Sequence, residues 1–452
     1  MSLSNQGRRA TSKQVALAAA LTGAERCSEH EVASYLDAML HSARGTHGET
    51  FLVGKGIRRM AGLNAFLYEA IPLDSDELRA AIERGVPQGD RIWRHADFLT
   101  DYFRAYSVDF IDSPLRSIFY DTMSCVKYWR GPWCIFDKQA AVLEKGGHHV
   151  KRIAFSELIS DMRQSALKKK IWKKMAQWSF PVNRNVVRVN DYIAYLFDRC
   201  PIVSVTEWDM WYPQNTIADE TDAFRRKSVV DNQQEQDRQR KLAGAKGDTD
   251  DAEMLANTIP TLPIDALARD LRKIFDNLGN KTSLSKFKIG HASSIEWSRM
   301  TGHFVRLMMF FDGSQIADPV AHTDRLGDYC IEATQGGMTY VNRNRESNRY
   351  PEAGLIHADD EQARRALLHR LLLWAQKEQF LRVKASSDFK TFRTGDIPPV
   401  WRAVSPPIAM SKVPDAGGGY FGHPCSAGAG RDGISRCITQ RTACRAIRLY
   451  LT

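Results

Sequence analysis

The sequence lacks long apolar runs and has few cysteines. No stretch approaches the roughly 18 consecutive apolar residues that a membrane-spanning helix needs, so we expect no membrane span. Eight cysteines among 452 residues are too sparse for a disulfide framework. Cys27, Cys125, Cys134, Cys200 and Cys330 stand far apart in apolar contexts. This pattern predicts buried free thiols in a reducing compartment, and we expect the cytoplasm.

Acidic residues are absent from the first 24 positions. This segment carries the pair Arg8 and Arg9 and a run of small residues from Val15 to Ala24. We interpret residues 1–27 as a basic arm that leads into a first helix. A targeting segment is the alternative, and it would place the protein in an organelle or the nucleus.

Apolar residues, in contrast, are plentiful. The sequence is 43% hydrophobic, with twenty phenylalanines and ten tryptophans, and this excludes a wholly disordered chain. A chain of 452 residues exceeds the size that one core serves well, which predicts two or more domains. The net charge of +10 favours polyanionic partners and says nothing about the fold.

Residues 28–224 predict a mainly helical domain. Ser28 is a helix N-cap candidate, because acidic residues and then apolar residues at helical spacing follow it. A second helix is expected at 74–85. The aromatic residues between 96 and 130 recur at helical spacing, which is typical of core packing. The segment "PIVSVTEW" from Pro201 alternates apolar and polar residues and predicts a strand.

The rest of the chain predicts a linker, a smaller α+β domain and a tail. Residues 225–258 are polar and charged, as in a linker or an exposed helix. In residues 259–400 we expect a helix at 262–279, a buried strand at 303–311, a hairpin at 328–343 about Gly336 and Gly337, and a helix running into a short strand at 359–384. A helix followed by a strand at the end of this domain is compatible with a winged helix. Residues 401–452 are rich in Gly and Ala, and we expect a flexible tail. The predicted fold class is therefore α+β and predominantly helical.

The segment 151–189 carries ten basic residues against only Glu157 and Asp161, a local charge of +8. Its apolar residues form two stripes that point in different directions. The segment is therefore either two short helices with a break near Ala166 or one helix that is buried on two sides. In both cases the lysines must be solvated or paired outward, because burying them unpaired would be prohibitive. These lysines are Lys168, Lys169, Lys170, Lys173 and Lys174.

We interpret this segment as a nucleic-acid-binding surface. The five lysines with Arg184 and Arg188 would contact phosphates and release counterions, and Trp172 and Trp178 would stack on bases. The plainer alternative is a solvated basic face whose tryptophans belong to the core. An anionic membrane surface is a third reading, which we disfavour because the apolar faces are needed for packing.

A second cluster concentrates carboxylates and a histidine. Asp318, His322, Asp324 and Asp328 are candidate catalytic residues, and Asp312 and Glu332 flank them. On a strand His322 and Asp324 would face the same way and could hold Mg or Mn for phosphodiester hydrolysis. We favour a surface loop with helix-capping aspartates, because no recognised ligand spacing is met.

Two further segments fail their motifs. The glycine-rich stretch around Lys55 has the wrong spacing for a phosphate-binding loop and lacks the Ser or Thr that would hold magnesium. His423, Cys425, Cys437 and Cys444 have no zinc-binding spacing. We therefore expect no metal and no cofactor.

Together these patterns predict a nucleic-acid-binding protein of replication, recombination or packaging, DNA and RNA being equally open. Nothing in the sequence requires an enzyme. The alternatives are a metal-dependent nuclease or phosphodiesterase, and a structural, capsid-like protein that packages nucleic acid. The oligomeric state stays open.

Overall fold

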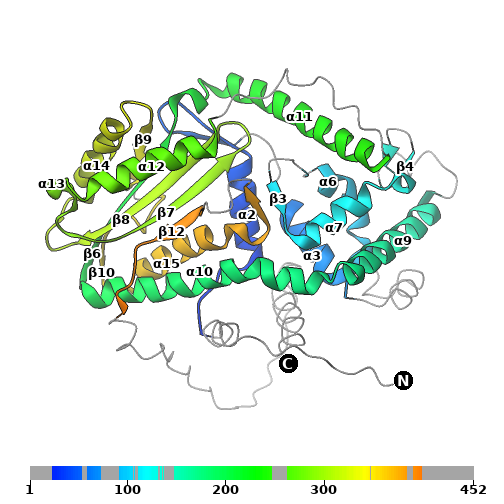
Figure 1. The fold of residues 1–452 in the computed structure, drawn as a ribbon, viewed down its shortest axis with the longest axis horizontal. Coiled ribbons are helices and arrows are strands. Elements are labelled where there is room, and N and C mark those ends of the chain that lie inside the picture. The colour runs from blue at the N-terminus through cyan, green and yellow to red at the C-terminus, as the bar shows by residue number, and fades with distance from the viewer. Residues whose placement is uncertain are drawn as a thin grey trace, which may run out of the picture. The chain divides into compact units, whose positions relative to one another are not determined.

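The computed structural model describes residues 23–52, 59–72, 91–104, 106, 110–130, 133–134, 136, 147–246, 262–346, 348–383 and 390–399. Residues Arg26–Ile397 form one compact unit (Figure 1). Its fold is α+β and predominantly helical, as predicted. None of the helices in the described ranges has the length and hydropathy required to cross a membrane.

A six-stranded antiparallel sheet is the centre of the unit. Its strand order is β10-β6-β8-β7-β12, and β9 also pairs with β6. The strands are β6 (Ile202–Trp211), β7 (Lys288–Ser298), β8 (Gly302–Asp312), β9 (Thr339–Asn342), β10 (Gly354–His357) and β12 (Phe392–Thr394). The strands predicted at 201–208 and 303–311 are confirmed. Both are buried on their two faces, so the polar residues of β6 point into the protein and not into water.

One face of the sheet is apolar. Trp208, Leu307 and Phe311 of this face pack against the helices α12 (Ile264–Leu278) and α14 (Pro319–Ala333). The predicted helix at 262–279 is confirmed, because its apolar residues recur along a single stripe that this face buries.

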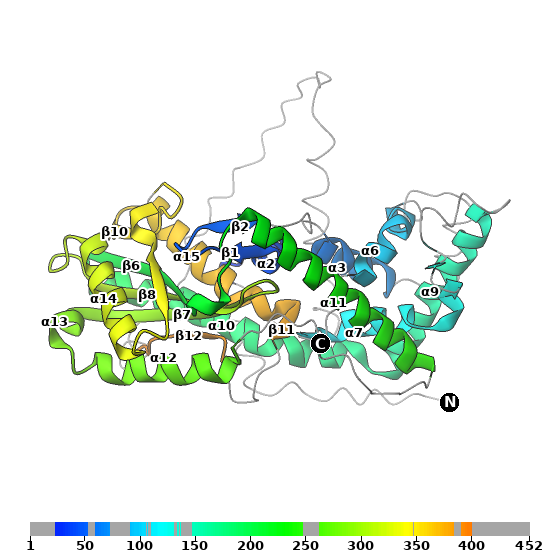
Figure 2. The ribbon, with the colours of Figure 1, turned by 90° about the horizontal axis from the view of Figure 1, so that it is seen from above.

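The opposite face is covered by α2 (Glu29–Leu40), α15 (Glu361–Gln376) and part of α10 (Ile171–Arg199). Figure 2 shows the sheet between α12 on one side and α15 on the other. Helix α2 begins as predicted. Ser28 Oγ accepts a hydrogen bond from the Glu31 N–H, and the Glu31 carboxylate accepts one from the Ser28 N–H. The two bonds form a capping box.

A helical region surrounds a second core. Its helices are α3 (Arg59–Ala70), α6 (Leu99–Arg104), α7 (Pro114–Met123) and α9 (Gly147–Lys168), joined by the start of α10. Phe103, Phe119 and Tyr128 lie in this core, so the prediction of aromatic core packing is confirmed for them. Phe98 is the exception, with 46% of its surface exposed. The helix predicted at 74–85 lies outside the described residues.

Smaller elements complete the unit. They are the paired strands β1 (Ser42–Arg44) and β2 (Thr50–Leu52), β3 (Phe110–Asp112) with β11 (Leu381–Val383), and β4 (Trp129–Arg130) with β5 (Trp133–Cys134), the helix α13 (Thr282–Ser285), and the 3-10 turns Ala96–Phe98, Val126–Tyr128, Pro213–Asn215, Arg343–Glu346 and Lys377–Gln379.

Residues 220–246 form the long helix α11 (Glu220–Lys246), which confirms the exposed-helix alternative for this stretch. The domain boundary predicted at 225–258 falls inside the compact unit, because β6, which precedes it, pairs with β8, which follows it. Residues 247–258 lie outside the described residues.

The hairpin predicted at 328–343 is wrong. Its first arm belongs to α14, which Asp318 caps by accepting the Ala321 N–H at 3.0 Å. The helix ends where Gly336, with φ of 74°, donates its N–H to Ile331 O at 2.9 Å. The two glycines therefore end a helix, and only β9 is a strand. The winged-helix interpretation is also wrong, because β11 after α15 pairs with the distant β3.

Candidate nucleic-acid interface

The lysine-rich segment is a corner between two helices. Helix α9 ends at Lys168 and α10 begins at Ile171, so the two-helix alternative is confirmed, with the break at Lys169 and Lys170 rather than near Ala166. Lys170 adopts the left-handed conformation, with φ of 50° and ψ of 52°. Ala166 and Ile171 both lie in the helical core, and the left-handed residue turns the chain between them.

The five lysines Lys168, Lys169, Lys170, Lys173 and Lys174, here called the basic corner, are all exposed. This confirms that they are solvated or paired outward. Lys169 binds Asp121 at 3.0 Å, with side chains 44% and 46% exposed. Within the described ranges, no acidic group lies within salt-bridge distance of the other four. Partial burial raises the pKa of the Asp121 carboxyl, but hydrogen bonds from Lys169 and Lys241 outweigh this effect and lower the pKa below its usual value.

The helix ends treat these charges differently. Lys168 lies at the C-terminus of α9, where the helix dipole favours a cation. Lys173 and Lys174 lie in the first turn of α10, where the dipole disfavours cations by about 0.3–1 kcal/mol each. This turn has no acidic residue, and its N-cap makes no side-chain hydrogen bond. The basic corner is therefore locally unfavourable for α10.

Arg184 is exposed on α10, as a phosphate contact requires. Arg188 instead ties α10 to the end of β12. Its Nε donates to Thr394 Oγ1 at 2.7 Å, and its Nη2 donates to Gly395 O at 3.0 Å. We therefore leave Arg188 out of the surface considered below.

The two tryptophans are engaged in packing. Trp172 is partly buried against the helical core. Trp178 donates its indole N–H to Gln379 O at 2.9 Å, and the guanidinium of Arg382 lies 3.8 Å from the centre of its ring. Both contacts fit the alternative in which these side chains are structural.

The candidate catalytic residues lie along α14 with separate contacts. Asp318 caps the helix, which confirms the capping alternative at that position. His322 is buried with its ring edge against Phe311. Asp324 accepts from Asn342 Nδ2 at 2.8 Å and pairs with Arg345, while Asp328 accepts from Tyr340 at 3.1 Å.

His322 and Asp324 do not face the same way, which corrects the expectation for a strand. Two residues apart on a helix are about 200° apart around its axis. The flanking carboxylates are also separate, since Asp312 accepts from Ser314 and Glu332 pairs with Lys281 at 3.6 Å. Among the described residues, no three His, Cys, Asp or Glu side chains are placed to hold a metal ion.

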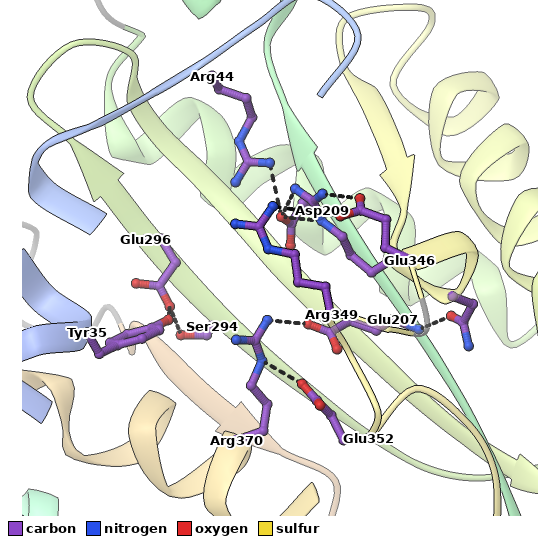
Figure 3. A network of polar contacts seen from close by, with 12 residues as sticks. Tyr35, Arg44, Glu207, Asp209, Ser294, Glu296, Glu346, Arg349, Glu352 and Arg370 are labelled. Atoms are coloured by element: carbon purple, nitrogen blue, oxygen red, sulfur yellow. Dashed lines mark hydrogen bonds and ion pairs between the residues drawn. The ribbon is translucent and has the colours of Figure 1, made fainter. Parts of the chain in front are cut away.

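Sequence reasoning missed a charged network on the sheet face beneath α2 and α15 (Figure 3). Asp209 Oδ2 of β6 accepts from Arg343 Nη2 at 2.7 Å, and Arg44 Nη1 forms an ion pair with the same oxygen at 3.0 Å. Glu207, two residues earlier on the same face, accepts from Arg370 of α15 at 2.8 Å. The sequence held a signal for this network, because Glu207 and Asp209 stand two residues apart at the end of a predicted strand and so share one of its faces.

Strand β7, which β8 separates from β6 in the sheet, adds a third buried carboxylate. Glu296 Oε1 accepts from Tyr35 of α2 at 2.7 Å and from Ser294 at 2.7 Å, and Lys377 Nζ lies 3.4 Å away. Arg306 of β8 lies next to this group, with its guanidinium 5.6 Å from the centre of the Tyr35 ring. Burial lowers the pKa of Lys377.

The carboxylate of Asp209 stays ionised although it is buried. Burial alone would raise the pKa of Asp209, but Arg343 and Arg44 lower it far below its usual range. Burial lowers the pKa of the Arg44 guanidinium to about 10. Within this network, three buried carboxylate oxygens have no hydrogen-bond partner among the described residues, namely Glu207 Oε2, Asp209 Oδ1 and Glu296 Oε2. None of these described carboxylates belongs to a cluster that could hold a metal ion. The network instead attaches α2 and α15 to the sheet, through Tyr35 and Arg370.

The remaining sequence predictions divide by location. The five cysteines Cys27, Cys125, Cys134, Cys200 and Cys330 are free, as predicted, and all but Cys125 are buried. The stretch around Lys55 and the tail residues His423, Cys425, Cys437 and Cys444 lie outside the described residues. Comparisons with family models, curated proteins and solved structures find no match for this chain.

Proposed function

We propose that this protein binds the phosphate backbone of nucleic acid through the basic corner and Arg184. One observation carries the proposal: five exposed lysines gather where α9 meets α10, and four of them have no acidic partner among the described residues. Such a surface would release several counterions from a phosphate backbone, which makes binding strong at low salt and steeply salt-dependent.

The solvated-face alternative explains the exposure of the lysines but not their positions. A face that meets only water gains nothing from cations in the first turn of α10, which oppose the helix dipole. It also gains nothing from a lysine at the left-handed position 170, where glycine would relieve about 1 kcal/mol of strain. A bound anion would offset the dipole penalty, and a lysine at position 170 would add a cation to the contact that glycine could not supply.

An anionic membrane surface is a weaker partner. An interfacial helix inserts an apolar face into the lipid. At the corner only Leu167, with 74% of its surface exposed, is a large apolar side chain open to solvent, whereas Ala166 and Ile171 lie in the core.

The test is fluorescence-anisotropy binding to a labelled oligonucleotide duplex between 50 and 200 mM salt. Six cations that each contact one phosphate predict a slope of log K against log salt near −5, or about a thousandfold loss over this range. With all five lysines changed to Gln, only Arg184 remains, and the slope should fall to about −1.

A charge-matched control separates the corner from net charge. It changes five exposed cations at and near α12 to Gln, namely Arg269, Arg272, Lys273, Lys281 and Lys286. Both variants lower the net charge from +10 by five. The control should keep the steep slope. Equal losses in the two variants would refute a defined corner, and a wild type that binds neither this duplex nor a single strand at 50 mM salt would refute the function.

A further inference from the structure

We infer that the nucleic acid bound at the basic corner is double-stranded; this rests on the proposed function. Proteins that hold single strands combine a basic surface with aromatic rings on which bases stack, and each stacked base contributes about 1–3 kcal/mol. The corner has the charge, but its neighbouring aromatic side chains are engaged within the protein.

Trp178 is the aromatic residue best placed to serve as such a platform, and three contacts hold it. Its indole N–H donates to Gln379 O, and the Arg382 guanidinium covers its ring at 3.8 Å. Arg382 also donates to the Trp178 carbonyl oxygen at 2.6 Å, which fixes the guanidinium over the ring. A base would have to displace this cation before it could stack.

The other aromatic residues of the segment are also covered. Trp172 packs on the helical core, and Phe180 is partly buried. Among the described residues, the large apolar side chains open to solvent on α9 and α10 are Ile153 and Leu167, and neither is aromatic. The surface therefore offers charge without stacking.

The spacing of the cations also favours a stiff ligand. Lys174 and Arg184 lie ten residues apart on one helix, which separates them by about 15 Å along its axis. Cations that project from one helix keep their backbone spacing and can meet the regularly spaced phosphates of a duplex, whereas a single strand must be ordered to meet them and loses conformational entropy. Counterion release per contact is also larger for a duplex, with slopes near −0.9 against −0.7.

The experiment compares a 24-base-pair DNA duplex with one of its strands, chosen without self-complementarity, by anisotropy at equal salt. We expect the duplex to bind at least tenfold more tightly. Trp178→Leu should change single-strand affinity less than twofold, because the ring takes no part. The charge-matched control at and near α12 serves as the reference for both ligands.

The outcomes separate the two proposals. Single-strand binding as tight as duplex binding, or a tenfold loss of it in Trp178→Leu, would overturn this inference and leave phosphate binding at the corner intact. Absence of binding to both ligands at 50 mM salt would overturn the proposed function and this inference with it.

Discussion

Asp209→Asn is the substitution with the sharpest expected effect on stability. The carboxylate is 1% exposed and lies between the guanidinium groups of Arg343 and Arg44, whose side chains are 3% and 7% exposed. Asparagine has nearly the same shape, so packing is preserved. The change removes one negative charge and leaves two buried cations facing a neutral amide.

The magnitude follows from the burial of the pair. Breaking a buried ion pair on one side costs about 3–5 kcal/mol, because an uncompensated charge stays in the interior. The lowered pKa of Asp209 also indicates that its ionised form stabilises the folded protein. A carboxyl group whose folded pKa lies far below its unfolded value contributes stability above about pH 4 and loses it as the pH falls further. In Asp209→Asn this acid-dependent part of the unfolding free energy should disappear.

Glu346→Gln is the matched control, because Glu346 binds the same guanidinium. Its Oε1 lies 2.5 Å from Arg343 Nη1, but its side chain is 34% exposed, and Arg343 keeps its ion pair with Asp209 in the variant, so no buried charge loses its only partner. We expect a loss below about 1 kcal/mol.

The assay is urea unfolding at pH 7, followed by tryptophan fluorescence and circular dichroism. Asp209→Asn should lower the midpoint strongly with an unchanged slope, which indicates altered stability and not an altered unfolded state. Equal losses in the two variants, or a loss below 1 kcal/mol for Asp209→Asn, would refute the view that the network is held together by buried charge.

Three further predictions concern the corner and the buried histidines. Lys170→Gly should raise the unfolding free energy by about 1 kcal/mol relative to Lys170→Ala, since only glycine relieves the left-handed backbone, while both variants flatten the salt slope equally; equal stability would refute the strain. Asp121→Asn removes the carboxylate that competes with phosphate for Lys169, so it should strengthen binding at fixed salt by about two- to fivefold, with the slope still near −5 and a stability loss below about 1 kcal/mol; weaker binding would argue against contact through Lys169. Burial lowers the pKa of both His95 and His303 to about 4. Because the unfolded chain binds these protons from about pH 6.5 downward, urea unfolding at pH 6.5 and pH 5 should show a loss of about 1.5 kcal/mol per histidine, and a pH-independent midpoint would refute it.

Local signals made several elements predictable. The N-cap at Ser28 and the single apolar stripe from Ile264 to Leu278 are properties of short windows, and α2 and α12 follow from them. The disagreement between two apolar stripes predicted either a break in the lysine segment or one helix buried on two sides, and the break at Lys169 and Lys170 decides between them. The hairpin failed because Gly336 fits a helix end as well as a turn, and the cap that decides between them, at Asp318, lies 18 residues earlier.

The buried charges could not be located in this way. Alternation along β6 indicates which residues share a face, but it does not show whether that face meets water or protein. The decision depends on distant partners: Arg343 lies 134 residues from Asp209, and Arg370 lies 163 residues from Glu207.

These partners also explain why the face is charged. Apolar helices could pack on either face of an apolar sheet with a similar gain in free energy. The buried carboxylates of Glu207, Asp209 and Glu296 instead favour helices that bring cations to matching positions. Of the helices that contact the sheet, α15 brings Arg370, and α2 is followed directly by Arg44. Since burying ion pairs adds little net stability, the larger effect of the network is to determine which helices pack on which face. The lysines of the corner follow the opposite rule. They remain charged in water, and in the function proposed above a partner from outside the chain neutralises them, in addition to Asp121, which pairs with Lys169.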